Sequence, residues 1–135
     1  MSAVPTASAA PIADIEQARF DRTLIDLQLA DPAARVALSE DTGLAIGMDA
    51  NVRMAMPEAS RMLSTTDRAA AASVLFLDQH GGLFGVPGWH SLEPRYASPL
   101  GSTIWFTFAA RTRRGEVLVN VCTKDDTVLH VRVTD

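Results

Sequence analysis

Residues 103–133 read TIWFTFAARTRRGEVLVNVCTKDDTVLHVRV, and they decide the fold. Three runs in this stretch alternate between apolar and more polar residues, and two short turn sequences separate them. A period of two residues is typical of a β-strand with one buried face. The stretch therefore predicts a three-stranded antiparallel meander at the C-terminus of an α+β domain.

The two turns predict which residues pair. A two-residue turn at 114–115 pairs Phe108 with Val121, and a loop at 124–126 pairs Val121 with Leu129. A slip of one residue would move every side chain to the other face, so the apolar set fixes the face. The other face then carries the rows Thr107–Cys122–Val128, Ala109–Asn120–His130 and Arg111–Leu118–Arg132, with Trp105 near one end.

This second face is too polar for a sealed core and too apolar for an ordinary solvent-exposed surface. It is a mixed surface, the wall of a ligand pocket, or a protein interface. The residues that we expect to bind a ligand here are Trp105, Thr107, Asn120, His130, Arg111 and Arg132.

Asn120 and His130 form the strongest polar pair in the sequence. An imidazole beside an amide, with Arg111 and Arg132 at the rim, suits binding of a carboxylate or polarisation of a carbonyl. The alternative is a surface pair without a chemical role. If the protein is an enzyme, His130 is the candidate general base and Asn120 the candidate polarising group.

We expect neither a metal nor a cofactor. His80, His90 and His130 show no HxH, HxxxH or HExxH spacing. Cys122 lies in mid-strand without a neighbouring base, so we expect a small buried hydrophobic residue rather than a nucleophile. The glycines between residues 81 and 88 follow no phosphate-binding pattern.

Helices are expected before the sheet. Residues 12–30 show helical apolar spacing, and Asp31-Pro32 predicts a second helix that ends near Glu40. Residues 44–56 alternate as one strand or as a hairpin, and Pro57 begins a short helix over 58–63.

The middle of the chain is interpreted from composition. Residues 67–72 are compatible with a helix, and the apolar runs at 73–78 and 83–86 predict a hairpin around Gly81-Gly82. The proline- and glycine-containing stretch 87–102 predicts a long surface loop.

A length of 135 residues favours one domain, which we place at residues 13–135 after a flexible N-terminal arm at 1–12. Net charge is −4, and residues 1–49 carry eight acidic residues against three arginines. The sequence lacks a large basic cluster, an apolar run of membrane length and a signal-like start. We therefore expect a cytoplasmic protein that binds neither nucleic acid nor membrane. Eleven of its twelve basic residues are arginine, which favours a GC-rich bacterial genome.

The order of helices and antiparallel strands, with the segment 36–41 leading into the alternation and then residues 52–63, resembles the cone-shaped superfamily of ketosteroid isomerases, polyketide cyclases and nuclear-transport-factor-like proteins. The resemblance covers residues 12–134 and rests on element order. It implies a curled sheet whose second face lines a pocket, with Trp105, Asn120 and His130 at interior positions and Asp49 as a further possibility. No paired acid of the kind found in that superfamily's pockets is evident.

The sequence favours a non-catalytic binding domain that uses one face of its sheet for a partner protein or for a small apolar or carboxylate ligand. We expect a homodimer. One alternative is a small cofactor-independent isomerase- or cyclase-type enzyme, and another is a subunit of a larger assembly tethered by its N-terminal arm.

Overall fold

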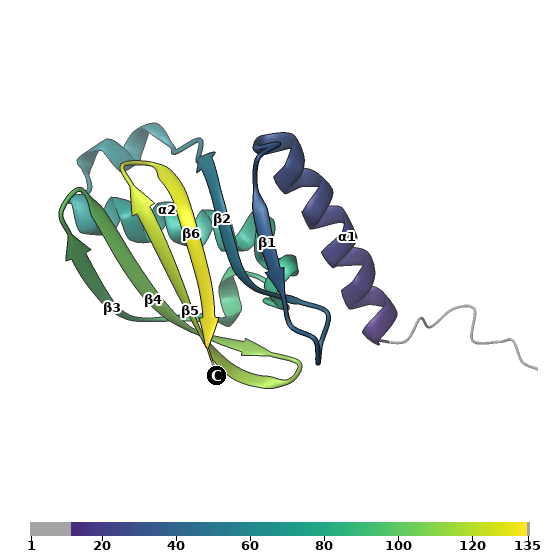
Figure 1. The fold of residues 1–135 in the computed structure, drawn as a ribbon. Helices are drawn as coiled ribbons and strands as arrows, with labels where there is room; N and C mark the ends of the chain where they lie inside the picture. Colours follow the sequence, from purple (N-terminus) through teal and green to yellow (C-terminus); the bar gives the residue numbers. More distant parts are fainter. Residues whose placement is uncertain (1–11, 135) are drawn as a thin grey trace, which may run out of the picture.

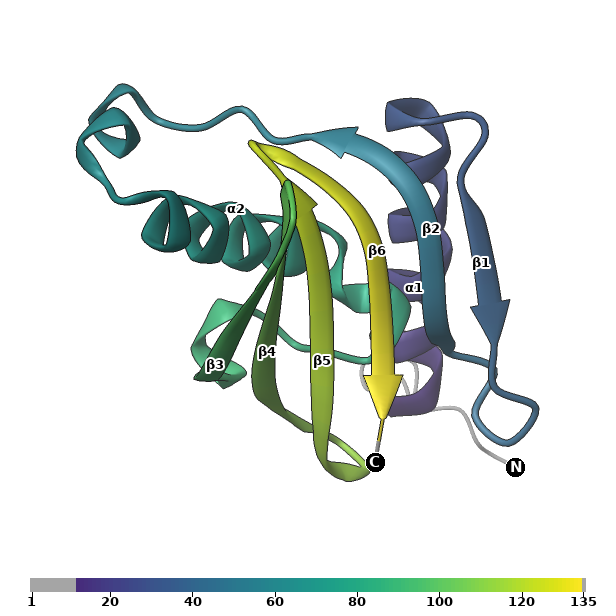
Figure 2. The same cartoon turned by 60° about the vertical axis from the view of Figure 1, so that its left-hand side comes forward.

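The computed structural model describes residues 12–134 and places a six-stranded sheet against the helices of this part of the chain. The sheet is curved, and both α-helices pack on the same side of it (Figures 1 and 2). The predicted α+β fold with a C-terminal meander is confirmed. In chain order the elements are α1 (Ile12–Ala30), β1 (Arg35–Leu38), β2 (Ala45–Arg53), η2 (Glu58–Met62), α2 (Thr65–His80), η3 (Gly81–Phe84), η4 (Trp89–Ser91), β3 (Leu92–Leu100), β4 (Thr103–Thr112), β5 (Gly115–Lys124) and β6 (Thr127–Thr134).

The strand order is β1-β2-β6-β5-β4-β3, and all neighbouring strands are antiparallel. The first turn of the meander lies one residue earlier than predicted, because Thr112 pairs with Gly115. The Thr112 hydroxyl closes this turn by donating to the Gly115 carbonyl oxygen at 2.7 Å. Phe108 therefore pairs with Val119 and not with Val121. The predicted partner was wrong by two residues, a shift that leaves every side chain on its predicted face.

The second turn differs from the prediction in two ways: it is a two-residue turn at 125–126, because Lys124 pairs with Thr127, and a β-bulge follows it. The register shifts between Cys122 and Thr123, so Val121 pairs with Val131 instead of Leu129. A bulge inserts one extra residue into a strand and changes which side chains point inward. Val128 is consequently fully buried and Leu129 only half-buried, the reverse of the predicted arrangement.

The predicted second helix is wrong, because Arg35–Leu38 forms the edge strand β1. Asp31 was the expected N-cap, and its carboxylate does accept the Ala33 N–H at 3.0 Å. Its other oxygen accepts the Asn51 N–H at 2.8 Å, which joins the end of α1 to β2. The chain therefore turns here and pairs with the open edge of β2, where its backbone groups find partners.

The alternating segment 44–56 forms one strand, β2, instead of a hairpin. The turn before it contains Gly43 with a φ of 74°, a conformation that favours glycine. The short helix predicted at 58–63 is present as the 3-10 helix η2.

The hairpin predicted over residues 73–86 is wrong. Helix α2 starts at the N-cap Ser64, whose hydroxyl accepts the Asp67 N–H at 3.1 Å, and it continues through the apolar run. A short apolar run fits a buried helix as well as a buried strand, so its composition did not decide between them. Its buried residues recur at helical spacing, at Ser73, Phe76, Leu77 and His80.

The long surface loop predicted at 87–102 is also wrong, since this stretch contains η4 and the edge strand β3. Proline is tolerated on an edge strand, where its missing N–H leaves no pairing unmade. Pro94 and Pro99 both lie in β3, and the register shifts between Pro94 and Tyr96.

The core lies between the helices and the inner face of the sheet. Phe76 and Leu77 of α2 and Leu27 of α1 are fully buried with Phe108 and Val121 of the meander. Burying side chains of this size stabilises a fold by about 1.5–3 kcal/mol each. The predicted N-terminal arm lies outside the described residues, apart from Ile12.

Candidate functional site

The candidate site is the outer face of the sheet, which points away from both helices. In the observed register its rows differ from the predicted ones because of the turn shift and the bulge. Across β4, β5 and β6 the rows are Trp105–Cys122–His130, Thr107–Asn120–Arg132 and Ala109–Leu118–Thr134. We call this surface the outer face.

Asp49 extends the outer face onto β2, because it pairs with His130 of β6. Its Oδ1 lies 2.7 Å from His130 Nδ1 and accepts a hydrogen bond from Arg132 Nη2 at 2.8 Å. The hydrogen bond from Arg132, and then that from His130, hold the pKa of the Asp49 carboxyl below its usual range. An ionised carboxylate in this position fixes the imidazole with its Nδ1 proton toward Asp49, which leaves Nε2 as the other ring nitrogen for a partner.

Arg132 donates three hydrogen bonds within the protein, one of them to Asp49. Its Nη1 donates to the carbonyl oxygens of Met48 at 3.0 Å and Val131 at 2.8 Å. A guanidinium in this state has fewer donors for an outside carboxylate than the sequence suggested. Arg132 therefore orders the outer face more than it offers an anion site.

Asn120 and Thr107 form a second closed pair. The Thr107 hydroxyl donates to Asn120 Oδ1 at 2.7 Å, and Asn120 Nδ2 donates to the Arg132 carbonyl oxygen at 3.4 Å. Asn120 lies one row away from His130, and its amide is already occupied on both sides. The structure therefore does not bring Asn120 and His130 together as a polarising pair.

The aromatic part of the outer face is its most accessible feature. The Trp105 ring stacks on the His130 ring, with centroids 6.1 Å apart and planes 10° from parallel. Tyr96 and Leu100 of β3 remain 59% and 62% exposed. A shallow hollow of about 400 Å³ runs between these side chains, lined by Tyr96, Ser98, Leu100, Trp105, Thr107, Asn120 and Arg132.

Arg111 stands apart from the other predicted ligand residues. It pairs with Glu116 at the far end of β4 and lines a different hollow, with His90 and Leu92. Cys122 is buried in the row of His130, and burial raises the pKa of its thiol. It therefore lacks the environment of a reactive thiolate.

Tyr96 and Leu100 were missed because they lay in the stretch predicted as a loop. The period-two spacing of Tyr96, Ser98 and Leu100 was a signal, which Pro94 and Pro99 concealed. Asp49 was noted only through the resemblance.

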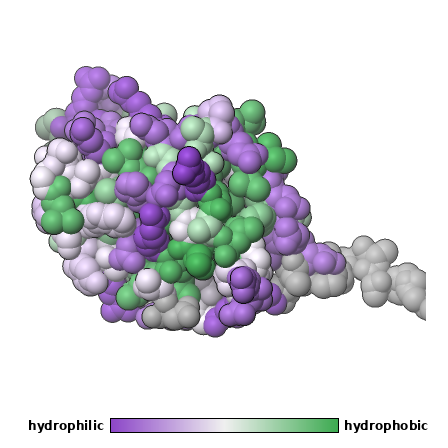
Figure 3. Space-filling model, in the orientation of Figure 1, coloured by the Kyte–Doolittle hydropathy of each residue, from purple (hydrophilic) through white to green (hydrophobic). Residues whose placement is uncertain are grey.

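Figure 3 looks onto the outer face and shows hydrophilic and hydrophobic residues interleaved over it. Such a mixture differs from the inner face, whose buried side chains are nearly all apolar. His130 has 42% of its side chain exposed, and the hollows that contain the residues of this face are open to solvent.

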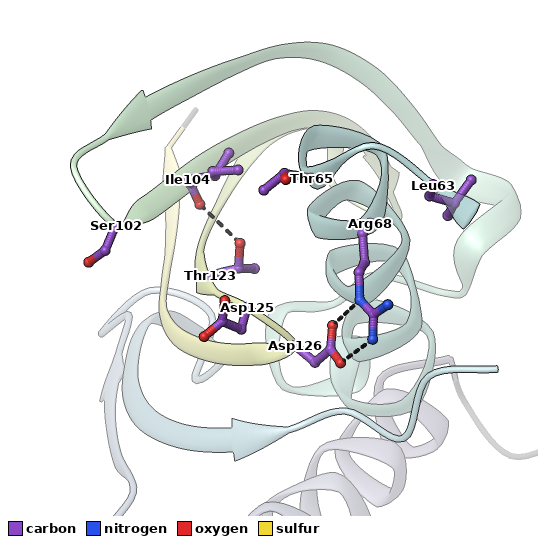
Figure 4. Close-up of a pocket in the computed structure, with 8 residues that line it drawn as sticks. All are labelled: Leu63, Thr65, Arg68, Ser102, Ile104, Thr123, Asp125 and Asp126. Atoms are coloured by element: carbon purple, nitrogen blue, oxygen red, sulfur yellow. Dashed lines mark hydrogen bonds and ion pairs between the residues drawn. The ribbon is translucent and has the colours of Figure 1, made fainter. Parts of the chain in front are cut away.

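A separate pocket of about 320 Å³ lies at the start of α2, between the β3–β4 and β5–β6 turns (Figure 4). Arg68 Nε and Nη2 each donate to the Asp126 carboxylate at 2.6 Å. Arg68 holds the pKa of Asp126 below its usual range. Because these opposite charges satisfy each other, we interpret the pair as a structural link between α2 and the β5–β6 turn.

Among residues 12–134, no three histidine, cysteine or acidic side chains converge in a way that could hold a metal ion. No helix in the described part of the chain is both long and apolar enough to cross a membrane.

Comparison with known proteins adds no identification: no family model matches this sequence, and no curated protein or solved structure gives a significant match.

Proposed function

We propose that this protein is a non-catalytic binding domain whose outer face is its binding surface. We further propose that this face binds a second copy of the chain, so that the protein is a homodimer. The observation that carries the proposal is the surface formed by the exposed side chains of Tyr96 and Leu100 beside the half-buried Trp105, over polar groups that bond to one another. Aromatic side chains and arginine are the residue types enriched in protein interfaces.

The shape of the outer face favours a protein over a small molecule. Small ligands bind in concave sites that cover most of their surface. The hollow beside Trp105 is shallow and open, and its polar groups already satisfy one another, as in the pair of Thr107 and Asn120. A broad protein surface covers such an area without needing free donors.

The charges on the outer face favour a second copy. Asp49 and Glu116 lie on this face together with Arg132 and Arg111. A two-fold axis places each patch against the same patch of the other subunit. Because Asp49 is already paired with Arg132 and His130 within one subunit, the face presents little unpaired charge and does not repel its own copy.

Light scattering on the purified protein tests this proposal. We expect twice the mass of one chain for the wild type and the mass of one chain for Leu118→Glu and for Tyr96→Glu. Tyr96 is 59% exposed, so its substitution leaves the fold intact. Met62→Glu is the matched control, because Met62 is 90% exposed and does not line the outer-face hollow. A wild type with the mass of one chain would contradict the proposal.

A second candidate function is the isomerase- or cyclase-type enzyme that the resemblance implies. The contact between His130 Nδ1 and Asp49 favours it, because a carboxylate that orients an imidazole is the arrangement of a general base. Turnover of an activated carbon acid such as a nitrobenzisoxazole tests this candidate. If His130 is a general base, the wild type should turn over this compound faster than the His130→Gln variant. Equal turnover rates for the two proteins would exclude that role.

A further inference from the structure

Helix α1 carries an apolar stripe on the side that faces away from the protein. Ile15, Ile25 and Leu29 are 51%, 57% and 78% exposed, whereas Phe20 and Leu27 are buried on the opposite side. The stripe consists of Ile15, Ala18, Arg22, Ile25 and Leu29, which recur every three or four residues. This spacing is typical of a helix that packs against another helix, and within residues 12–134 the three large apolar side chains of the stripe remain exposed.

The inner side of α1 fixes the helix on the body. Arg19 Nη2 donates to the carbonyl oxygens of Val86 at 3.3 Å and Pro87 at 3.1 Å. Glu16 accepts hydrogen bonds from Arg114 Nη2 at 2.8 Å and Nη1 at 3.0 Å. The rest of the fold therefore fixes the orientation of the helix that carries the stripe. Figure 2 shows this helix behind β2.

Acidic side chains flank the stripe. Asp14, Asp21 and Asp26 are all exposed, and Arg22 lies within the stripe. The guanidinium of Arg19 is turned toward the body by its two carbonyl contacts. The surface around the stripe thus carries more negative than positive charge, in keeping with the acidic balance of residues 1–49.

We propose that the stripe on α1 binds an amphipathic helix of a partner protein whose apolar side is flanked by lysine or arginine. Apolar anchors at helical spacing supply the contact area in this mode of recognition. Basic flanks complement Asp14, Asp21 and Asp26. A second copy of α1 would bring the same acids against each other, and an anionic lipid surface would repel them. The stripe lies away from the outer face, so the two surfaces can be occupied together.

A labelled peptide tests this site. The probe is a short helical peptide with leucine at heptad positions a and d and lysine at e and g, and its binding is measured by fluorescence anisotropy. We expect saturable binding to the wild type and a Kd at least about tenfold higher for the double variant Ile25→Asp, Leu29→Asp. Met62→Asp is the matched control and should bind as the wild type does.

Charge reversal provides the second arm. Asp21→Lys with Asp26→Lys should weaken binding of the lysine peptide and permit binding of the same peptide with glutamate at e and g. The proposal is overturned if the lysine peptide does not bind, if the Ile25 and Leu29 variant binds it equally, or if charge reversal changes nothing. A loss of self-association in the Ile25→Asp, Leu29→Asp variant would also overturn the proposal. That result would mean that a second copy of the chain, and not a partner helix, binds the stripe.

Discussion

The inner and outer faces of the meander are formed by alternate residues of the same strands, yet their chemistry differs. Phe108, Val119 and Val121 on the inner face are 0% exposed. On the outer face, Thr107 bonds to Asn120, and Trp105 stacks on His130. The hydrophobic effect accounts for the inner face. The hydrophobic effect does not require ordered hydrogen bonds beside the exposed side chains of Tyr96 and Leu100, and this difference supports the proposal that the outer face binds a partner.

The largest effect is expected on the inner face. Phe108→Ala should lower the free energy of unfolding by about 3–5 kcal/mol, because it removes a fully buried ring and leaves a cavity. Thr107→Ala, one residue away on the outer face, removes a single hydrogen bond and should cost about 1 kcal/mol. Urea denaturation of both variants measures the difference. Equal losses would contradict the contrast between the faces.

The two arginine–carboxylate ion pairs Arg68–Asp126 and Arg61–Glu58 should also differ in stability, because the first is more buried than the second. Arg68→Ala breaks a two-bond ion pair whose side chains are only 30% and 16% exposed, and we expect a loss of about 1–3 kcal/mol. Arg61→Ala is the matched control, because its pair with Glu58 is 72% and 81% exposed and should contribute less than about 0.5 kcal/mol. Similar midpoints in urea for the two variants would show that the Arg68–Asp126 link carries no stability.

The pH dependence of folding stability tests the effect of the buried histidine, His80. His80 is 6% exposed, its Nδ1 has no hydrogen-bond partner among residues 12–134, and burial lowers its pKa. The unfolded chain therefore binds a proton at His80 at a higher pH than the folded chain does. Stability should be fully present above the unfolded pKa of about 6.5 and should fall as pH drops toward the folded pKa.

Urea denaturation at pH 7.5 and pH 5.5 measures the loss of folding stability that results from protonation of His80. His80→Leu should show a smaller loss between the two pH values than the wild type. An unchanged loss would assign the pH dependence to other groups.

The smallest effect on stability is expected on the exposed aromatic part of the outer face. Tyr96→Ala should change the free energy of unfolding of the isolated chain by no more than about 0.5 kcal/mol, because most of the ring is in solvent. The same substitution should weaken self-association measurably in sedimentation equilibrium. A large loss of folding stability would mean that Tyr96 belongs to the fold and not to an interface.

Local pattern predicted the meander well, because the alternation in β4 and β5 assigns each side chain to a face even when the predicted partner is wrong by two residues. It did not predict the bulge at Cys122, because nothing in the local sequence distinguishes Val128 from Leu129. Helix α2 and strand β3 were missed for a related reason. A buried apolar run and a proline-containing edge acquire their structure from tertiary neighbours.

The candidate site was predicted in part. Trp105, Thr107, Asn120, His130 and Arg132 do share a face, as the alternation required. Which of these side chains touch one another depends on which residues are cross-strand neighbours. The position of the turn and the β-bulge between β5 and β6 determine those neighbours. The role of Asp49 depends on the pairing of β2 with β6, two strands far apart in the sequence, which no local pattern specifies.

The most direct test of the outer face as a self-association surface is the urea midpoint as a function of protein concentration. Unfolding of a dimer is linked to dissociation, so its free energy should rise by about 1.4 kcal/mol for each tenfold increase in concentration. We expect the wild-type midpoint to increase with concentration and the Leu118→Glu midpoint to stay constant. A wild-type midpoint that does not change with concentration would contradict the central claim.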